Sequence, residues 1–80
     1  MEKPGKTINL PLKLGALIRH YRLKLKLSQE TLAEKADIHR TYVSDIELGK
    51  VEISITVASR IAKALNLTLG RLVKEAEALN

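Results

Sequence analysis

The segment between Ser28 and Gly49 restricts the fold more than any other part of the chain, because it contains two short helical stretches with almost no room between them. Ser28 is a typical first residue for a helix, since its hydroxyl accepts a hydrogen bond from a free amide of the first turn. The first stretch ends near Ala36, and the second runs from about His39 to Leu48, before Gly49 closes it. Two helices joined by about three residues must cross at a steep angle and pack closely.

This geometry makes demands that the sequence meets within the same window. The crossing needs a small residue inside the first helix, and Ala33 is there. The turn needs a residue that tolerates left-handed backbone angles, which Asp37 does better than most residue types. The space between the helices must be filled by apolar side chains, and the candidates are Leu32, Ala36, Ile38, Val43 and Ile46. Together these features predict a helix-turn-helix motif.

The rest of the chain also has a helical period. Apolar residues at steps of three and four predict helices at about residues 12–26, 55–65 and 69–79, and the last two follow the capping residues Ser54 and Thr68. Asn66 is expected to form the turn between them. Residues 1–11 have no helical period and are interpreted as a flexible N-terminal arm, with the domain covering residues 12–80. No strand is predicted, so the fold class is all-α with five helices.

The motif and its surroundings resemble a known family. The matching residues are the run Ser28–Ala36, then Ile38, Tyr42–Ser44, Ile46–Glu47, Gly49 and the run Ile61–Leu67. They are similar to the Cro/CI (Xre-type) repressor family, and residues 39–44 look most like the controller proteins of restriction-modification systems. The resemblance implies a five-helix bundle of the lambda-repressor-like DNA-binding type. It also implies a transcriptional regulator that binds double-stranded DNA. The chain departs from the family's usual residues at Asp37, Leu48 and Asn66.

Positive charge is concentrated near the start of the chain. Residues 1–26 carry seven Lys and Arg against Glu2 alone, within a formal net charge of +5 for all 80 residues. Such an excess favours a polyanionic partner, although solvated helix faces would also explain it. There is no Cys, which excludes disulfides and thiolate metal sites and is typical of a reducing cytosol. We therefore predict a cytoplasmic protein with no metal, cofactor, small-molecule ligand or membrane partner.

The second helix of such a motif enters the major groove of DNA with its N-terminal residues on the base edges. With Val43 and Ile46 facing inward, the candidate base contacts are Arg40, Thr41, Tyr42, Ser44 and Asp45. Arg40 is the strongest, because its guanidinium can donate two hydrogen bonds to guanine O6 and N7, although a phosphate contact remains the alternative. Asp45 is the weakest: it either accepts from cytosine N4 or pairs with a lysine. Tyr42 lies either against the groove wall or partly buried beside the first helix.

A second group of residues is expected to contact the DNA backbone. The candidate phosphate contacts are Gln29, His39, Lys50, Lys24 and Lys26. Gln29 opens a helix whose free amides favour anions, and it resembles the family's phosphate-binding glutamine. For His39, a simple solvated helix cap is the alternative.

Two further interactions are expected within or between copies of the chain. The resemblance implies a structural ion pair between Arg22 and Glu47, which would remove Arg22 from the base-reading residues. The C-terminal part has more apolar residues than a five-helix core obviously needs, so a dimer interface is predicted from Leu65, Leu67, Leu69, Leu72, Val73 and Ala76. Core packing alone is the alternative. A dimer would place two recognition helices about 34 Å apart, on a pseudo-palindromic operator.

Other functional classes fit the sequence less well. An enzyme is not expected, because His39, Ser44 and Asp45 project from one short helix with no pocket implied. The main alternative is a protein-interaction module, such as the antitoxin of a toxin–antitoxin pair. Binding that depends on phosphates would weaken steeply with salt, whereas an apolar partner interface would not.

Overall fold

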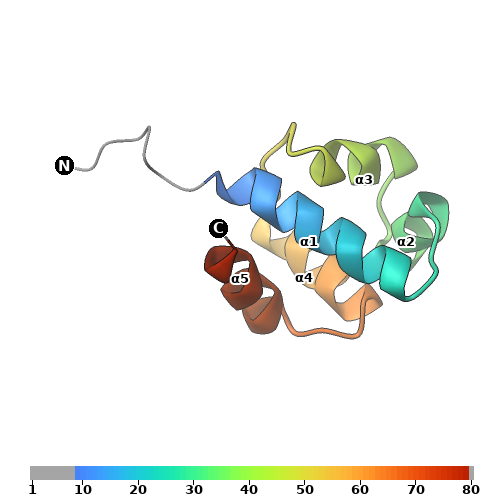
Figure 1. Cartoon of the computed structure of the whole chain (residues 1–80). Coiled ribbons are helices and arrows are strands. Elements are labelled where there is room, and N and C mark those ends of the chain that lie inside the picture. Colours follow the sequence, from blue (N-terminus) through green and yellow to red (C-terminus); the bar gives the residue numbers. More distant parts are fainter. Residues whose placement is uncertain (1–8, 80) are drawn as a thin grey trace.

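The computed structural model describes residues 9–79, and within that range the chain forms α-helices only (Figure 1). The helices are α1 (Leu10–Lys24), α2 (Gln29–Ala36), α3 (Arg40–Glu47), α4 (Ile55–Ala64) and α5 (Leu69–Ala78). The all-α, five-helix prediction is therefore confirmed.

A side chain caps the N-terminus of every helix. The capping residues are Asn9, Ser28, His39, Ser54 and Thr68, each accepting a hydrogen bond from a backbone amide two or three residues later. Such caps satisfy amides that have no partner inside the helix. The starts of α2, α4 and α5 lie where the sequence predicted them.

The start of α1 differs from the prediction, which placed residues up to 11 in a flexible arm. Asn9 caps the helix by accepting from the amide of Leu12, and Leu10 and Pro11 form its first turn. Proline is tolerated at this position because the first-turn amides have no helical partner to lose. The remainder of the predicted arm, residues 1–8, lies outside the described residues.

Four residues with left-handed backbone angles separate the helices. Asp37, Gly49 and Asn66 adopt positive φ angles of 59°, 72° and 64°, as their positions in the sequence predicted. Lys26 also has a φ of 59°, which the sequence did not predict. For this reason α1 ends at Lys24 and not at Lys26.

The helices surround one apolar core. α1 packs against α3 on one side and against α5 on another, α2 packs against α3 and α4, and α4 contacts α5 (Figure 1). The largest fully buried side chains are Ile18, Leu32, Val43, Ile61, Leu65 and Leu72. None of the helices in the described part is long and apolar enough to cross a membrane.

Candidate nucleic-acid interface

α3 lies at one edge of the molecule (Figure 1). Val43, Ile46 and Glu47 are buried on its inner side. On the outer side, Arg40 and Thr41 are exposed, while Ser44 and Asp45 are partly exposed. The structure therefore brings these four predicted base contacts onto one accessible surface.

Tyr42 occupies an intermediate position between this surface and the core. Its side chain is half-buried and packs against the core cluster. The sequence left a groove-wall position and partial burial open, and the structure shows partial burial. The exposed part of the side chain lies on the same helix as the base contacts.

Behind α3, a buried ion pair ties three parts of the chain together. The Nε of Arg22 donates to Glu47 at 2.6 Å, and its Nη2 donates to the other carboxylate oxygen at 3.0 Å. Both residues are buried, with exposed fractions of 7% and 6%. The Nη1 of Arg22 also donates to the carbonyl of Leu27 in the turn before α2. Arg22 thus joins α1, this turn and α3.

Gln29 belongs to the same network. Its side-chain amide donates to the Glu47 carboxylate at 3.0 Å. One amide hydrogen of Gln29 is therefore used inside the protein, which fixes the side chain at the N-terminus of α2. The sequence suggested a phosphate contact for Gln29 but did not reveal this bond, because the two residues are 18 positions apart.

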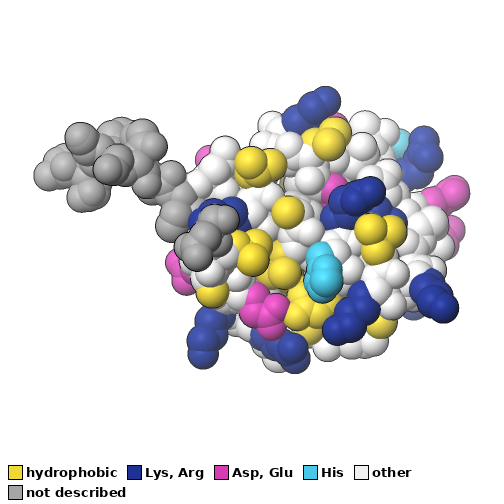
Figure 2. Space-filling model, viewed as in Figure 1, with side chains coloured by type: hydrophobic (Ala, Val, Ile, Leu, Met, Phe, Trp, Pro, Cys, Tyr) yellow, Lys and Arg dark blue, Asp and Glu magenta, His cyan; other side chains and the backbone are white. Residues whose placement is uncertain are grey.

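The candidate phosphate contacts fall into two groups. Lys26, in the turn before α2, and Lys50, just after α3, are exposed. His39 uses its Nδ1 to cap α3 by accepting a hydrogen bond from the amide of Thr41. Lys24 is different, because its ammonium lies 5.8 Å from the ring centre of Tyr21, on the α5 side of α1. Lys24 therefore lies toward α5 and is not expected to contact phosphates. Lys and Arg side chains are visible around α3 and also over α1 and α5, so positive charge alone does not mark one face (Figure 2).

The predicted dimer interface needs a correction. Leu65, Leu72 and Ala76 are at most 2% exposed and belong to the core of a single chain. Leu65 caps the C-terminus of α4, and Leu72 and Ala76 lie on the side of α5 that packs against α1 and α4. They cannot contact a second copy. Leu67, Leu69 and Val73 are only partly buried and remain accessible.

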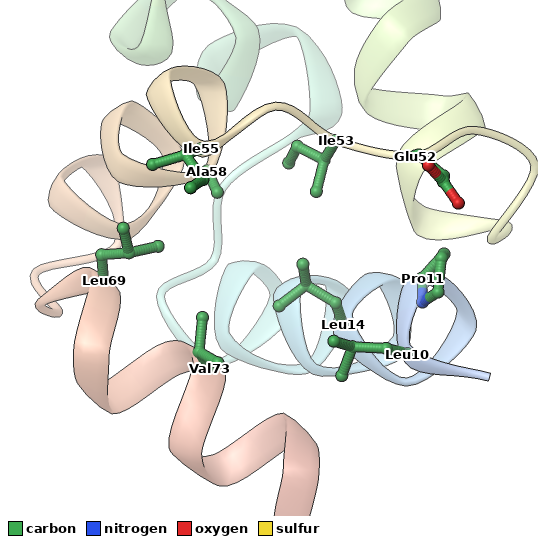
Figure 3. Close-up of a pocket in the computed structure, with 9 residues that line it drawn as sticks. All are labelled: Leu10, Pro11, Leu14, Glu52, Ile53, Ile55, Ala58, Leu69 and Val73. Carbon is green, nitrogen blue, oxygen red and sulfur yellow. The ribbon is translucent and has the colours of Figure 1, made fainter. Parts of the chain in front are cut away.

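Leu69 and Val73 line an apolar hollow of about 430 Å³ (Figure 3). α5 supplies these two residues, and α1, the loop before α4 and α4 itself supply Leu10, Pro11, Leu14, Glu52, Ile53, Ile55 and Ala58. At its rim, Ile55 is 76% exposed, the most of any large apolar residue in the described part. Ile55 was not among the predicted interface residues, although it lies three residues before Ala58 at the edge of the stripe that α4 buries.

A second polar cluster holds α5 against α1. The Tyr21 hydroxyl donates to Glu75 at 2.6 Å, and Arg71 donates to the other carboxylate oxygen at 2.7 Å. The hydrogen bond from Tyr21, followed by that from Arg71, lowers the pKa of Glu75 below its ordinary value. The same bond to Glu75 raises the pKa of Tyr21. This cluster was not predicted either, because 54 residues separate Tyr21 from Glu75.

Comparison with known proteins identifies the family. Residues 18–72 match the model of the helix-turn-helix family, which includes the whole of α2 and α3. This chain belongs to the helix-turn-helix family. The control protein C.BamHI of Bacillus amyloliquefaciens is 45% identical over 62 residues, which make up 76% of each chain.

Solved structures of helix-turn-helix proteins extend the likeness to three dimensions. The restriction-modification controller protein C.AhdI from Aeromonas hydrophila aligns with a TM-score of 0.75 and 34% identity, over 78% of this chain and 94% of that one. C.Esp1396I bound to a 25 base pair operator site aligns with a TM-score of 0.75 and 27% identity, over 88% of this chain and 96% of that one. The family is one of regulators and not of enzymes.

Proposed function

We propose that this helix-turn-helix protein is a sequence-specific transcriptional regulator that binds duplex DNA in the cytoplasm, with α3 in the major groove. The observation that carries the proposal is the exposed polar face of α3, held from behind by the buried Arg22–Glu47 pair. The likeness to C.Esp1396I, which has been seen on operator DNA, supports it.

In this proposal Arg40 reads a guanine, because its exposed side chain stands at the first position of α3. Thr41, Ser44 and Asp45 are the further base contacts, and Tyr42 contributes the exposed part of its ring at the groove wall. Gln29, His39, Lys26 and Lys50 position the protein on the phosphates.

The test is a selection from a randomised duplex pool at moderate salt, performed with the wild type and Arg40→Ala. We expect the wild type to enrich one motif and Arg40→Ala to lose about 1–3 kcal/mol of preference at one guanine. Lys74→Ala is the matched control, since it removes an exposed basic residue from α5 and should leave the motif unchanged. If wild type and Arg40→Ala retain the same unselected pool, the protein does not read DNA sequence.

We also propose that the protein binds as a symmetric homodimer through the apolar hollow. In a two-fold interface each copy contributes the same surface. A dimer at this surface would cover Ile55, Leu69 and Val73, whose exposure to water is unfavourable. The expected operator is then pseudo-palindromic, with half-sites one helical turn apart.

Ile55→Asp tests the dimer, because a charge at the rim would have to be desolvated in the interface. Sedimentation at micromolar concentration should show a dimer for the wild type and a monomer for Ile55→Asp. Leu23→Asp is the control, since Leu23 is 50% exposed on α1 and does not line the hollow. A monomeric wild type, or an Ile55→Asp variant that remains dimeric, would reject this interface.

A further inference from the structure

Leu48 is an apolar residue on the polar face of the recognition helix. It caps the C-terminus of α3 with helical backbone angles, φ −87° and ψ −2°, so the helical direction continues through it. It follows Ser44 by four residues and Arg40 by eight, which places the three side chains in one row along the helix. Its side chain is 57% exposed.

Neither the core nor the apolar hollow explains this leucine. Leu48 does not line the hollow, and the buried side of α3 is already formed by Val43, Ile46 and Glu47. In a free protein such exposure only costs hydration free energy. The side chain of Leu48 lies on the same accessible side of α3 as Arg40 and Ser44.

The major groove offers one prominent apolar group to such a side chain, the C5-methyl of thymine. We propose that Leu48 determines part of the sequence specificity by packing against a thymine methyl. The proposal rests on the function proposed above, in which α3 occupies the groove.

The dimensions of helix and groove determine where this thymine should lie. Eight residues at 1.5 Å each put Leu48 about 12 Å along the axis from Arg40. For a helix that lies along the groove, this distance spans about three to four base pairs, because successive base pairs are about 3.4 Å apart. The thymine is therefore expected about three to four base pairs from the guanine read by Arg40.

Uracil scanning of the selected operator tests the proposal, because deoxyuridine lacks only the methyl group of thymidine. Each thymine is replaced in turn, and the affinities of wild type, Leu48→Ala and Leu23→Ala are measured. Loss of one buried methyl predicts a weakening of about four-fold per half-site for the wild type, which corresponds to about 0.8 kcal/mol. Leu48→Ala should bind the thymine operator and the uracil operator with equal affinity. The control Leu23→Ala should keep the difference in affinity that the wild type shows.

The possible results separate this proposal from the proposed function. A specific operator without any uracil-sensitive thymine would overturn the role of Leu48 and leave DNA reading intact. Equal sensitivity in wild type and Leu48→Ala would assign the methyl to another residue and also overturn it. Failure to select any motif would reject the proposed function, and the role of Leu48 with it.

Discussion

At the scale of single residues, the largest loss of stability is expected when the buried carboxylate of Glu47 loses its cationic partner. Glu47 accepts hydrogen bonds from Arg22 and Gln29, and its side chain is 2% exposed. Arg22→Ala would leave this charge buried without its cation, so we expect a loss of about 3–5 kcal/mol, measured by urea unfolding. Such a loss is a large part of the stability of a small domain, and DNA affinity should fall with it.

Two other variants distinguish this effect from a general loss of charge. Arg71→Ala breaks an exposed pair on α5, with side chains 60% and 33% exposed, and should destabilise the protein far less, because solvent screens the pair. The double variant Arg22→Met/Glu47→Met removes both charges and should recover much of the stability. If Arg22→Ala were no less stable than Arg71→Ala, the pair would not brace the recognition helix.

Gly15 lies where α1 passes close to the backbone of α3. A Cβ at this position would lie 2.1 Å from the carbonyl oxygen of Ile46 and 3.0 Å from that of Glu47. Both are backbone atoms, so Gly15→Ala must displace the recognition helix, and we expect a loss of about 1–3 kcal/mol in thermal or urea unfolding. Gly70→Ala is the control: a Cβ there meets nothing within 4 Å, and the change should stabilise by up to about 1 kcal/mol. If Gly15→Ala and Gly70→Ala had the same effect on stability, close packing at Gly15 would be contradicted.

The sequence predicted residues whose roles depend on near neighbours in the chain. Ser28 and Ser54 cap helices through amides three residues away, and Asp37 adopts the left-handed backbone angles of the turn after α2. Contacts between distant positions were not predictable from spacing. The pairing of Arg22 with Glu47 came only from the family resemblance, and the additional bond from Gln29 to Glu47 required the structure.

At the scale of helices, α5 shows what periodicity predicts and what it does not. The spacing of its apolar residues predicted the helix, but it could not separate residues that face the chain's own core from those that remain accessible. Leu72 and Ala76 pack inward, and Val73 stays partly exposed, because α1 and α4 cover only one side of α5. The position of α5 is also fixed by polar contacts, including one from the Lys13 ammonium to the carbonyl of Leu79.

The cluster of Tyr21, Arg71 and Glu75 makes the attachment of α5 dependent on pH. The pKa of Glu75 is lowered in the folded protein, so its stabilising effect is present above its ordinary pKa of 4.5. That effect is lost as the pH falls through the lowered value. We expect Tyr21→Phe to be less stable than the wild type at pH 7, and the difference to shrink progressively below pH 4.5. Melting temperatures between pH 7 and pH 2.5 measure this.

A matched variant and a local probe make this test specific. Glu77→Gln changes a neighbouring exposed glutamate on α5 and should keep the wild-type pH profile. Hydrogen exchange at pH 7 should be faster in α5 of Tyr21→Phe than in α5 of the wild type. A constant difference between Tyr21→Phe and the wild type over the whole pH range would show that the hydroxyl acts independently of the Glu75 charge.

At the scale of the whole molecule, the dependence of binding on salt separates a DNA interface from a protein interface. Each phosphate neutralised by a lysine releases counterions, so the logarithm of the affinity falls with the logarithm of the salt concentration by about 0.9 per contact. Lys50 follows the recognition helix and is exposed. Lys50→Ala should therefore weaken binding to all sequences and reduce the slope by about 1 per protomer, or about 2 for a dimer.

The same salt titration with other variants tests which of the positively charged residues contact DNA phosphates. Lys74→Ala lies on α5 and should leave the slope unchanged, although it alters the net charge as much as Lys50→Ala does. Arg40→Ala should instead change the preferred sequence, because its contact is with a base. If all three variants changed the slope equally, net charge and not a defined face would attract the DNA. If binding of a partner were independent of salt, the apolar hollow and not α3 would be the contact surface, as an antitoxin-like module requires.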